Sequence, residues 1–210
     1  MNLKKNIFTL ISTTILFSCN NVSEKMRIDE PIIDTTKSFK IEDNWVTPKQ
    51  NFDFISVQKL SSDTLDLVSC GEYVYSPFGL LKNKYDLKNS LLKNFNISES
   101  VDSTDAGITE FQNLKIKSSS LTLFFDNDSE GVKRSYVFLG EIKDSEVNFF
   151  ENVKIGMSIY DFHKTFFNDF PKELKNKFKV IIFHSCVLDI DHIYSFQDNK
   201  LSSVKFNGGL

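Results

Sequence analysis

Residues 192–206 read HIYSFQDNKLSSVKF, in which apolar and polar side chains alternate on both sides of a short polar turn sequence. A period of two along the chain predicts strands with one buried and one solvated face. Residues 197–200, Gln-Asp-Asn-Lys, supply the residue types that tight hairpin turns favour. This stretch therefore predicts a pair of adjacent antiparallel strands near the C-terminus.

The same alternation occurs upstream, in NFDFISVQ (51–58), SLTLFFD (120–126) and SYVFLGEI (135–142). Asp126-Asn127-Asp128 is a second turn signal. The chain holds 21 Phe but only 8 Gly and 4 Pro, a composition that favours a packed core over a loop-rich chain. The predicted strands cover about 108–117, 120–126, 133–142, 178–190, 192–197 and 200–206.

Two stretches have helical periodicity, and they resemble each other. Residues 85–95 read YDLKNSLLKNF and residues 160–170 read YDFHKTFFNDF, with Tyr, Asp and Phe identical at a shift of 75. Their apolar positions form one helical stripe. Asn83 and Ser158 stand where N-caps are expected. The pattern predicts helices over 84–95 and 158–169.

Asp161 and His163, two residues apart in the second stretch, raise the question of a catalytic or metal site. Side chains two apart on a helix do not face each other. We interpret Asp161 as a first-turn residue that favours the helix dipole, and His163 as a polar residue on the solvated face. The prediction is that neither residue forms a site.

The order of elements predicts an α+β fold, with two tandem helix-plus-antiparallel-strand repeats forming a two-layer helix/sheet domain. This domain is expected to cover residues 49–210, as two related halves at about 49–142 and 143–210. Open strand edges of the two halves can pair and make one continuous sheet.

Residues 155–158, Ile-Gly-Met-Ser, open a short helix that is followed by strands with the aromatic hairpin of 192–206. This arrangement resembles the module of small outer-membrane assembly lipoproteins and the duplicated modules of β-lactamase-inhibitor-type proteins. The resemblance covers about residues 155–206 and implies a protein that binds other proteins. The Asn-, Lys-, Ile- and Phe-heavy composition is also similar to that of Bacteroidota envelope lipoproteins.

The N-terminus has the features of a targeting segment. Lys4 and Lys5 precede an apolar stretch over 7–17 that is shorter than the ~20 residues of a membrane-spanning helix. Ending in Leu-Phe-Ser-Cys, it resembles a bacterial lipoprotein signal peptide, which implies removal of residues 1–18 and lipidation of Cys19. The expected location is the cell envelope, anchored by lipid to the outer membrane and facing the periplasm or the surface.

Residues 19–48 lack sustained periodicity and are rich in charged and hydroxyl side chains, so we interpret them as the lipidated Cys and a flexible tether. The formal net charge of the whole chain is −3 and no basic patch is present, which argues against nucleic acid as a partner.

Beyond Cys19, the chain has two cysteines, Cys70 and Cys186. In an oxidising envelope they can form a disulfide, and the alternative is two separately buried thiols. Sequence spacing does not decide between the two.

The sharpest remaining candidate for chemistry is His184 and Cys186 with His192 or Asp191, residue types that can bind zinc. The alternation of the preceding run FKVIIF places His184 and Cys186 on the face of Val180 and Ile182, which we expect to be core. A nucleophilic Cys186 with His184 as its base is disfavoured, because side chains two apart on a strand diverge. We therefore predict no metal, no cofactor and no catalytic residue.

Two acidic segments, 98–105 and 126–130, are predicted to be exposed loops. The second lacks the late glutamate of a calcium loop, so a hairpin turn explains it better. If the domain binds a basic partner, these loops are the expected contact. Their acidic residues are Glu99, Asp102, Asp105, Asp126, Asp128 and Glu130.

Three functions are compatible with these features. The first is a non-enzymatic envelope protein that binds another envelope protein through a sheet face or acidic loops. The second is an inhibitor or immunity-type protein that blocks one enzyme, which predicts exposed aromatic side chains on an open sheet face. The third, the least favoured, is a zinc or thiol enzyme that uses His184, Cys186 and His192.

Overall fold

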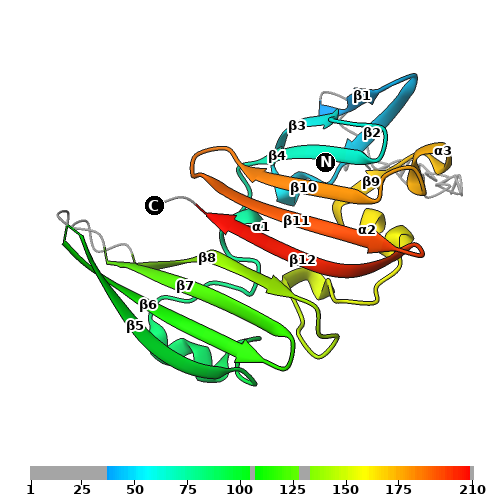
Figure 1. Ribbon diagram of the computed structural model, residues 1–210. Helices are drawn as coiled ribbons and strands as arrows, with labels where there is room; N and C mark the ends of the chain where they lie inside the picture. The colour runs from blue at the N-terminus through cyan, green and yellow to red at the C-terminus, as the bar shows by residue number, and fades with distance from the viewer. Residues whose placement is uncertain (1–36, 105–106, 128–132, 209–210) are drawn as a thin grey trace, which may run out of the picture. The chain divides into compact units, whose positions relative to one another are not determined.

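The computed structural model of the chain describes residues 37–104, 107–127 and 133–208 (Figure 1). Within these residues the fold is mostly β, with twelve strands in two sheets and only short helices. This corrects the predicted α+β fold of two helix/sheet repeats, because the helical segments are too short to form a layer comparable to the sheet. None of the described helices is long and apolar enough to cross a membrane.

Nine strands form the larger sheet, in the order β3-β4-β10-β11-β12-β8-β7-β6-β5. All neighbouring pairs are antiparallel except β4 and β10, which are parallel. The strands are β3 (Phe54–Lys59), β4 (Thr64–Ser69), β5 (Asn96–Thr104), β6 (Gly107–Ile116), β7 (Ser119–Asn127), β8 (Lys133–Ile142), β10 (Val180–Ser185), β11 (Ile190–Gln197) and β12 (Lys200–Gly208).

Strands β8 and β12 join the early and late parts of the chain. They pair from Val204↔Ile142 to Asn207↔Leu139, so β5–β8 and β10–β12 belong to one sheet. The expected pairing between open edges of the two halves is therefore present, although the halves are not the helix/sheet repeats that we predicted.

The hairpin predicted over 192–206 is confirmed. β11 and β12 pair as far as Gln197↔Lys200, and the two turn residues Asp198 and Asn199 have positive φ angles of 51° and 59°. Both turn positions of a type I′ hairpin require φ > 0, which Asp and Asn tolerate better than other non-glycine residues.

The two similar stretches adopt unlike structures. Lys84–Asn89 is a 3-10 helix (η3), whereas Ile159–Phe166 is an α-helix (α2) that ends where Phe167–Asp169 becomes strand β9. The predicted N-caps are confirmed: Asn83 accepts a hydrogen bond from the backbone N–H of Tyr85, and Ser158 from that of Asp161. The caps are local, but the helix ends depend on distant partners, since β9 pairs with β2.

The predicted tether extends too far along the chain. β1 (Phe39–Ile41) and β2 (Asn44–Pro48) form, with β9, the second sheet, in the order β1-β2-β9. Ile41 and Val46 are buried in the core. Residues 39–48 are therefore part of the folded domain, while 1–36, including Cys19, lie outside the described residues.

Aromatic side chains fill the space between one face of the sheet and the short helices α1 (Glu72–Tyr75) and α2. The ring of Phe183 on β10 lies 4.8 Å from that of Phe166 on α2 and 6.1 Å from that of Tyr73 on α1. Ring pairs at such separations add to the stabilisation from burial. We call the sheet face under these helices the covered face.

The opposite face of the sheet is open. Along β10, Ile181 and Phe183 are buried on the covered face, whereas Ile182 and His184 are only partly buried. β11 alternates in the same way over its whole length. The remaining short helices are η2 (Gln50–Phe52), η4 (Phe150–Asn152) and α3 (Lys172–Lys175).

Candidate functional site

The structure separates His184, Cys186 and His192, three of the residues that sequence suggested as metal ligands. His184 lies on the open face, His192 is completely buried on the covered face, and Cys186 follows β10. The expectation that His184 shares a core face with Val180 and Ile182 was wrong, because Ile181 and Phe183 form the core face of β10. Among the described residues, no group of three His, Cys, Asp or Glu side chains could hold a metal ion.

Cys186 forms a disulfide with Cys70, with the two Cα atoms 5.2 Å apart. The parallel pairing of β4 with β10 brings the ends of both strands together, at Ser69 opposite Ser185. Cys70 and Cys186 each come directly after those residues. A paired sulfur cannot act as a thiolate nucleophile or ligand, so the thiol chemistry considered above has no reactive group here.

His163 is buried, which corrects the prediction of a solvated position. Only 1% of it is exposed, and its ring stacks on Phe170 at 3.8 Å between centroids. Neither ring nitrogen has a hydrogen-bond partner among the described residues. Burial lowers the pKa of His163 to about 3, so the ring is neutral at pH 7. It packs as a core side chain.

His192 belongs to a second buried polar group. The hydroxyl of Tyr194 donates to the hydroxyl of Tyr73 at 3.0 Å and lies 3.5 Å from Nδ1 of His192. Burial lowers the pKa of His192 to about 3 and raises the pKa of both tyrosines. His192 and Tyr194 are fully buried and Tyr73 nearly so, so this set stabilises the core and does not form an accessible site.

Sequence reasoning missed one charged cluster on the open face. His184 lies between two carboxylates, with Nε2 2.6 Å from Oδ1 of Asp66 and Nδ1 2.5 Å from Oδ1 of Asp191. Asp66 also accepts a hydrogen bond from the Gln58 side chain at 2.9 Å. Four strands supply these residues, so only the strand order could have revealed the cluster.

The acidic segment 98–105, predicted to be a loop, lies mostly in strand β5. Its Glu99 carboxylate is 3.0 Å from the Lys84 ammonium group, which lowers the pKa of Glu99. The backbone of Asp102 lies in β5 and that of Asp126 in β7. Asp105, Asp128 and Glu130 lie outside the described residues. The structure therefore does not test whether the six acidic residues form one contact surface.

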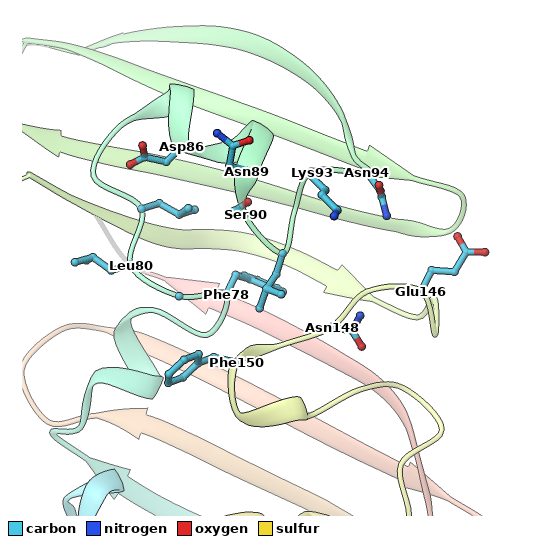
Figure 2. A pocket seen from close by; sticks show the side chains of 13 residues that line it. Phe78, Leu80, Asp86, Asn89, Ser90, Lys93, Asn94, Glu146, Asn148 and Phe150 are labelled. Atoms are coloured by element: carbon cyan, nitrogen blue, oxygen red, sulfur yellow. The ribbon is translucent and has the colours of Figure 1, made fainter.

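A groove of about 650 Å³ opens between the segments 78–94 and 146–150 (Figure 2). Three large apolar side chains on its rim are exposed: Leu80 by 53%, Leu91 by 42% and Phe150 by 45%. The buried ring of Phe78 forms its base and stacks on Phe149 at 4.9 Å. Exposed apolar side chains that gather at one site are typical of an interaction surface.

Polar groups complete the lining of this groove. Asp86 is already engaged, because its carboxylate accepts the backbone N–H groups of Lys82 and Asn83 in the cap of η3. The side chains of Asn89, Asn94 and Asn148 face solvent and carry both hydrogen-bond donors and acceptors. The groove thus combines apolar contacts with several groups that can orient a bound chain.

Backbone contacts set the two walls of the groove relative to each other. The N–H of Phe150 donates to the carbonyl of Pro77 at 2.7 Å, and the N–H of Gly79 donates to that of Ser76 at 2.9 Å. Gly79 has a φ of 83°, a conformation that favours glycine. Sequence reasoning noted Gly79-Leu80-Leu81 only as a departure from a motif, and here the segment forms one wall.

Comparisons with known proteins add no assignment: no protein family, curated protein or solved structure matches this chain.

Proposed function

We propose that this chain is a membrane-anchored lipoprotein of the cell envelope that binds another protein and is not an enzyme. The observation that carries the proposal is the groove of Figure 2, because three large apolar side chains that line it, Leu80, Leu91 and Phe150, are each substantially exposed. Burying such side chains against a partner removes apolar surface from water, which is the main favourable term in association.

The proposed anchor rests on the N-terminal sequence. The short apolar stretch ending in Leu-Phe-Ser-Cys resembles a lipoprotein signal, and Cys19 would carry the lipid. Two or more acyl chains hold a protein stably at a membrane, at about 0.8 kcal/mol per buried methylene. In an oxidising compartment a Cys70–Cys186 disulfide can persist, which supports the same location.

Photo-crosslinking in the native envelope tests the binding role. A photoreactive residue replaces Phe150 or Leu91 in one set of strains, and Val187 in the control strain. Val187 is a good control because it is 77% exposed and does not line the groove. We expect one discrete crosslinked protein from both groove positions and not from position 187, and we expect Leu80→Asp to remove it.

Equal crosslinking from position 187, or no crosslinked protein from either groove position, would count against the proposal. Anchoring is measured separately, by detergent partitioning of the wild type and of Cys19→Ala. A Cys19→Ala protein that still partitions with membranes would contradict the lipid anchor and leave the groove test unaffected.

An inhibitor or immunity-type role is the second candidate, and one observation favours it. The rings of Phe124 and Phe138 lie 6.1 Å and 5.6 Å from that of Phe111, on the open face of β6–β8, and Phe124 and Phe138 are partly exposed. An inhibitor acting through this face predicts that Phe124→Ala abolishes a one-to-one complex while Phe150→Ala does not. The reverse pattern favours the groove.

A further inference from the structure

The two outer strands of the nine-stranded sheet differ in how their free edges are protected. β3 has six residues, and its pairing with β4 shifts register between Phe54 and Ser56. Near the end of β3, the Nζ atom of Lys59 lies 2.6 Å from Oε1 of Glu42, which is at the β1–β2 turn. Short length, irregular pairing and a lysine are devices that prevent a strand edge from pairing with another chain.

β5, at the other edge, is longer and regularly paired, and its charged residues are acidic (Figure 1). It pairs with β6 over all nine residues, from Asn96↔Lys115 to Thr104↔Gly107, without a register shift. It contains no proline and no lysine. No strand among the described residues pairs with its outer side. Its outer backbone N–H and C=O groups are therefore available to another strand.

The side chains of β5 are also exposed. Every residue from 96 to 101 is exposed, including Ile97 by 40% and Val101 by 64%. Alternation along the strand places Ile97, Glu99 and Val101 on one side. Glu99 is paired with Lys84 of its own chain. An added strand would thus meet two apolar side chains with one exposed carboxylate between them.

We propose that β5 pairs antiparallel with β5 of a second copy of this chain, about a two-fold axis that passes between the two Ser100 residues. The two strands then make a continuous sheet across a symmetric dimer, in which each copy contributes the same surface. The proposal is independent of the groove and of the lipid anchor.

The register follows from the sequence of β5. A two-fold axis perpendicular to the sheet keeps equivalent faces on the same side, so one residue must lie opposite its own copy, with the axis between them. Ser100 is the central residue of Asn96–Thr104, so placing Ser100 opposite Ser100 pairs all nine residues. This register places Glu99 opposite Val101 and Ser98 opposite Asp102, so no acidic residue faces another. A register centred on Glu99 would place two glutamates opposite each other, which is unfavourable.

Disulfide trapping of full-length protein, purified in detergent, tests this register. With Ser100→Cys, the two new thiols lie directly opposite each other, and mild oxidation should give a covalent dimer. With Ser98→Cys, each new thiol lies opposite Asp102 and the two thiols are four residues apart along the strands, too far for a disulfide. Wild-type protein controls for its own cysteines.

Sedimentation of two charge variants tests the same contact without crosslinking. Val101→Glu places a carboxylate opposite Glu99 of the second copy, twice per dimer, and should raise the dimer Kd roughly tenfold. Val101→Lys places a cation there and should not weaken the dimer. Val101 is exposed, so both variants should fold, which circular dichroism and thermal unfolding verify.

The expected result is a concentration-dependent dimer, trapped by Ser100→Cys and weakened by Val101→Glu only. A protein that stays monomeric over the accessible concentration range overturns the proposal. So does a dimer that neither Val101 variant changes, or a crosslink that Ser98→Cys makes as well as Ser100→Cys. A Ser100→Cys crosslink to a different protein also overturns it and assigns β5 to another partner.

Discussion

At the scale of single residues, the buried histidines differ most from what their sequence context suggests. His163 lies between Phe162 and Lys164 and corresponds to Lys88 in the similar stretch 85–95. It is nevertheless buried, against Phe170. A ring without hydrogen-bond partners in the core is held neutral, because the charged form loses its hydration there. Its contribution to stability therefore depends on pH.

We expect unfolding free energy to fall as the pH is lowered from about 6.5 towards 3. The pKa values of His163 and His192 are about 3 in the folded protein, below the value of 6.5 for an unperturbed histidine. Between these values the unfolded state binds more protons than the folded state, so acid favours unfolding. Between pH 6.5 and 3, each histidine lowers the unfolding free energy by about 1.4 kcal/mol for each unit by which the pH falls. Above pH 6.5 it has no such effect.

Urea unfolding of the wild type and of His163→Phe at pH 7.5, 5.5 and 4.5 measures this effect. Phenylalanine keeps the aromatic contact with Phe170 and removes the titrating group, so we expect His163→Phe to be about as stable at pH 7.5 and clearly less sensitive to acid. Equal pH dependence of the two proteins would show that His163 is not neutral in the folded state.

The cluster on the open face gives a second prediction at this scale. Asp66 has only 7% of its side chain exposed, whereas Asp191 has 30%. His184→Gln should cost about 2 kcal/mol of unfolding free energy, because it takes the imidazole contact from a buried carboxylate oxygen and leaves Asp66 with only its Gln58 hydrogen bond. Asp191→Asn should cost well under half of that, because water solvates this position. Denaturant unfolding at pH 6 compares them, and equal losses would contradict the assigned difference in burial.

At the scale of elements, local turn and cap chemistry predicted the structure well, whereas helix length did not. The caps at Asn83 and Ser158 form as expected, and the strands predicted over 108–142 and 192–206 correspond closely to β6–β8, β11 and β12. β5 was predicted as a loop because its hydroxyl and acidic residues lack apolar alternation. Its nine pairs with β6 outweigh that weak propensity.

The β11–β12 turn gives a prediction at this scale. Asn199 has a φ of 59°, so Asn199→Gly should stabilise the protein by about 0.5 kcal/mol and Asn199→Val should destabilise it by about 1–2 kcal/mol. Lys115 is the matched control, because it is exposed in β6 without a positive φ, and there valine should be better than glycine. In thermal unfolding, the glycine variant should be the more stable of the two at position 199, and the valine variant at position 115. The same order of stability at both positions would contradict the turn assignment.

At the scale of the whole molecule, one disulfide joins strands that are far apart in sequence. Cys70 and Cys186 are separated by 116 residues, and they tie the ends of the only parallel strand pair among the described residues, β4 and β10. Closing so long a loop restricts the unfolded chain strongly. The crosslink therefore supports a strand pairing that closes a long loop and has a high loop-closure cost.

We expect Cys70→Ala with Cys186→Ala to lower the unfolding free energy by about 5 kcal/mol in the chain-entropy description. Denaturant titration of this double variant and of the wild type under oxidising conditions measures the loss. Added reductant should destabilise the wild type and leave the variant unchanged. A wild type that is insensitive to reductant would show that the disulfide does not form in solution.

The amino-acid sequence by itself determined the hairpin of 192–206, the caps of both helical segments and the strands flanking residue 120. It also named Cys70 and Cys186 as the two cysteines that could form a disulfide. These features depend on side chains and backbone groups a few residues apart, so local chemistry suffices. Tertiary structure alone decided the class of fold, the strands at 39–48, 96–104 and 167–169, the burial of His163, and the meeting of Asp66, His184 and Asp191. Each of these depends on which distant strand lies alongside, because strand pairing and burial are set by partners that no local pattern names.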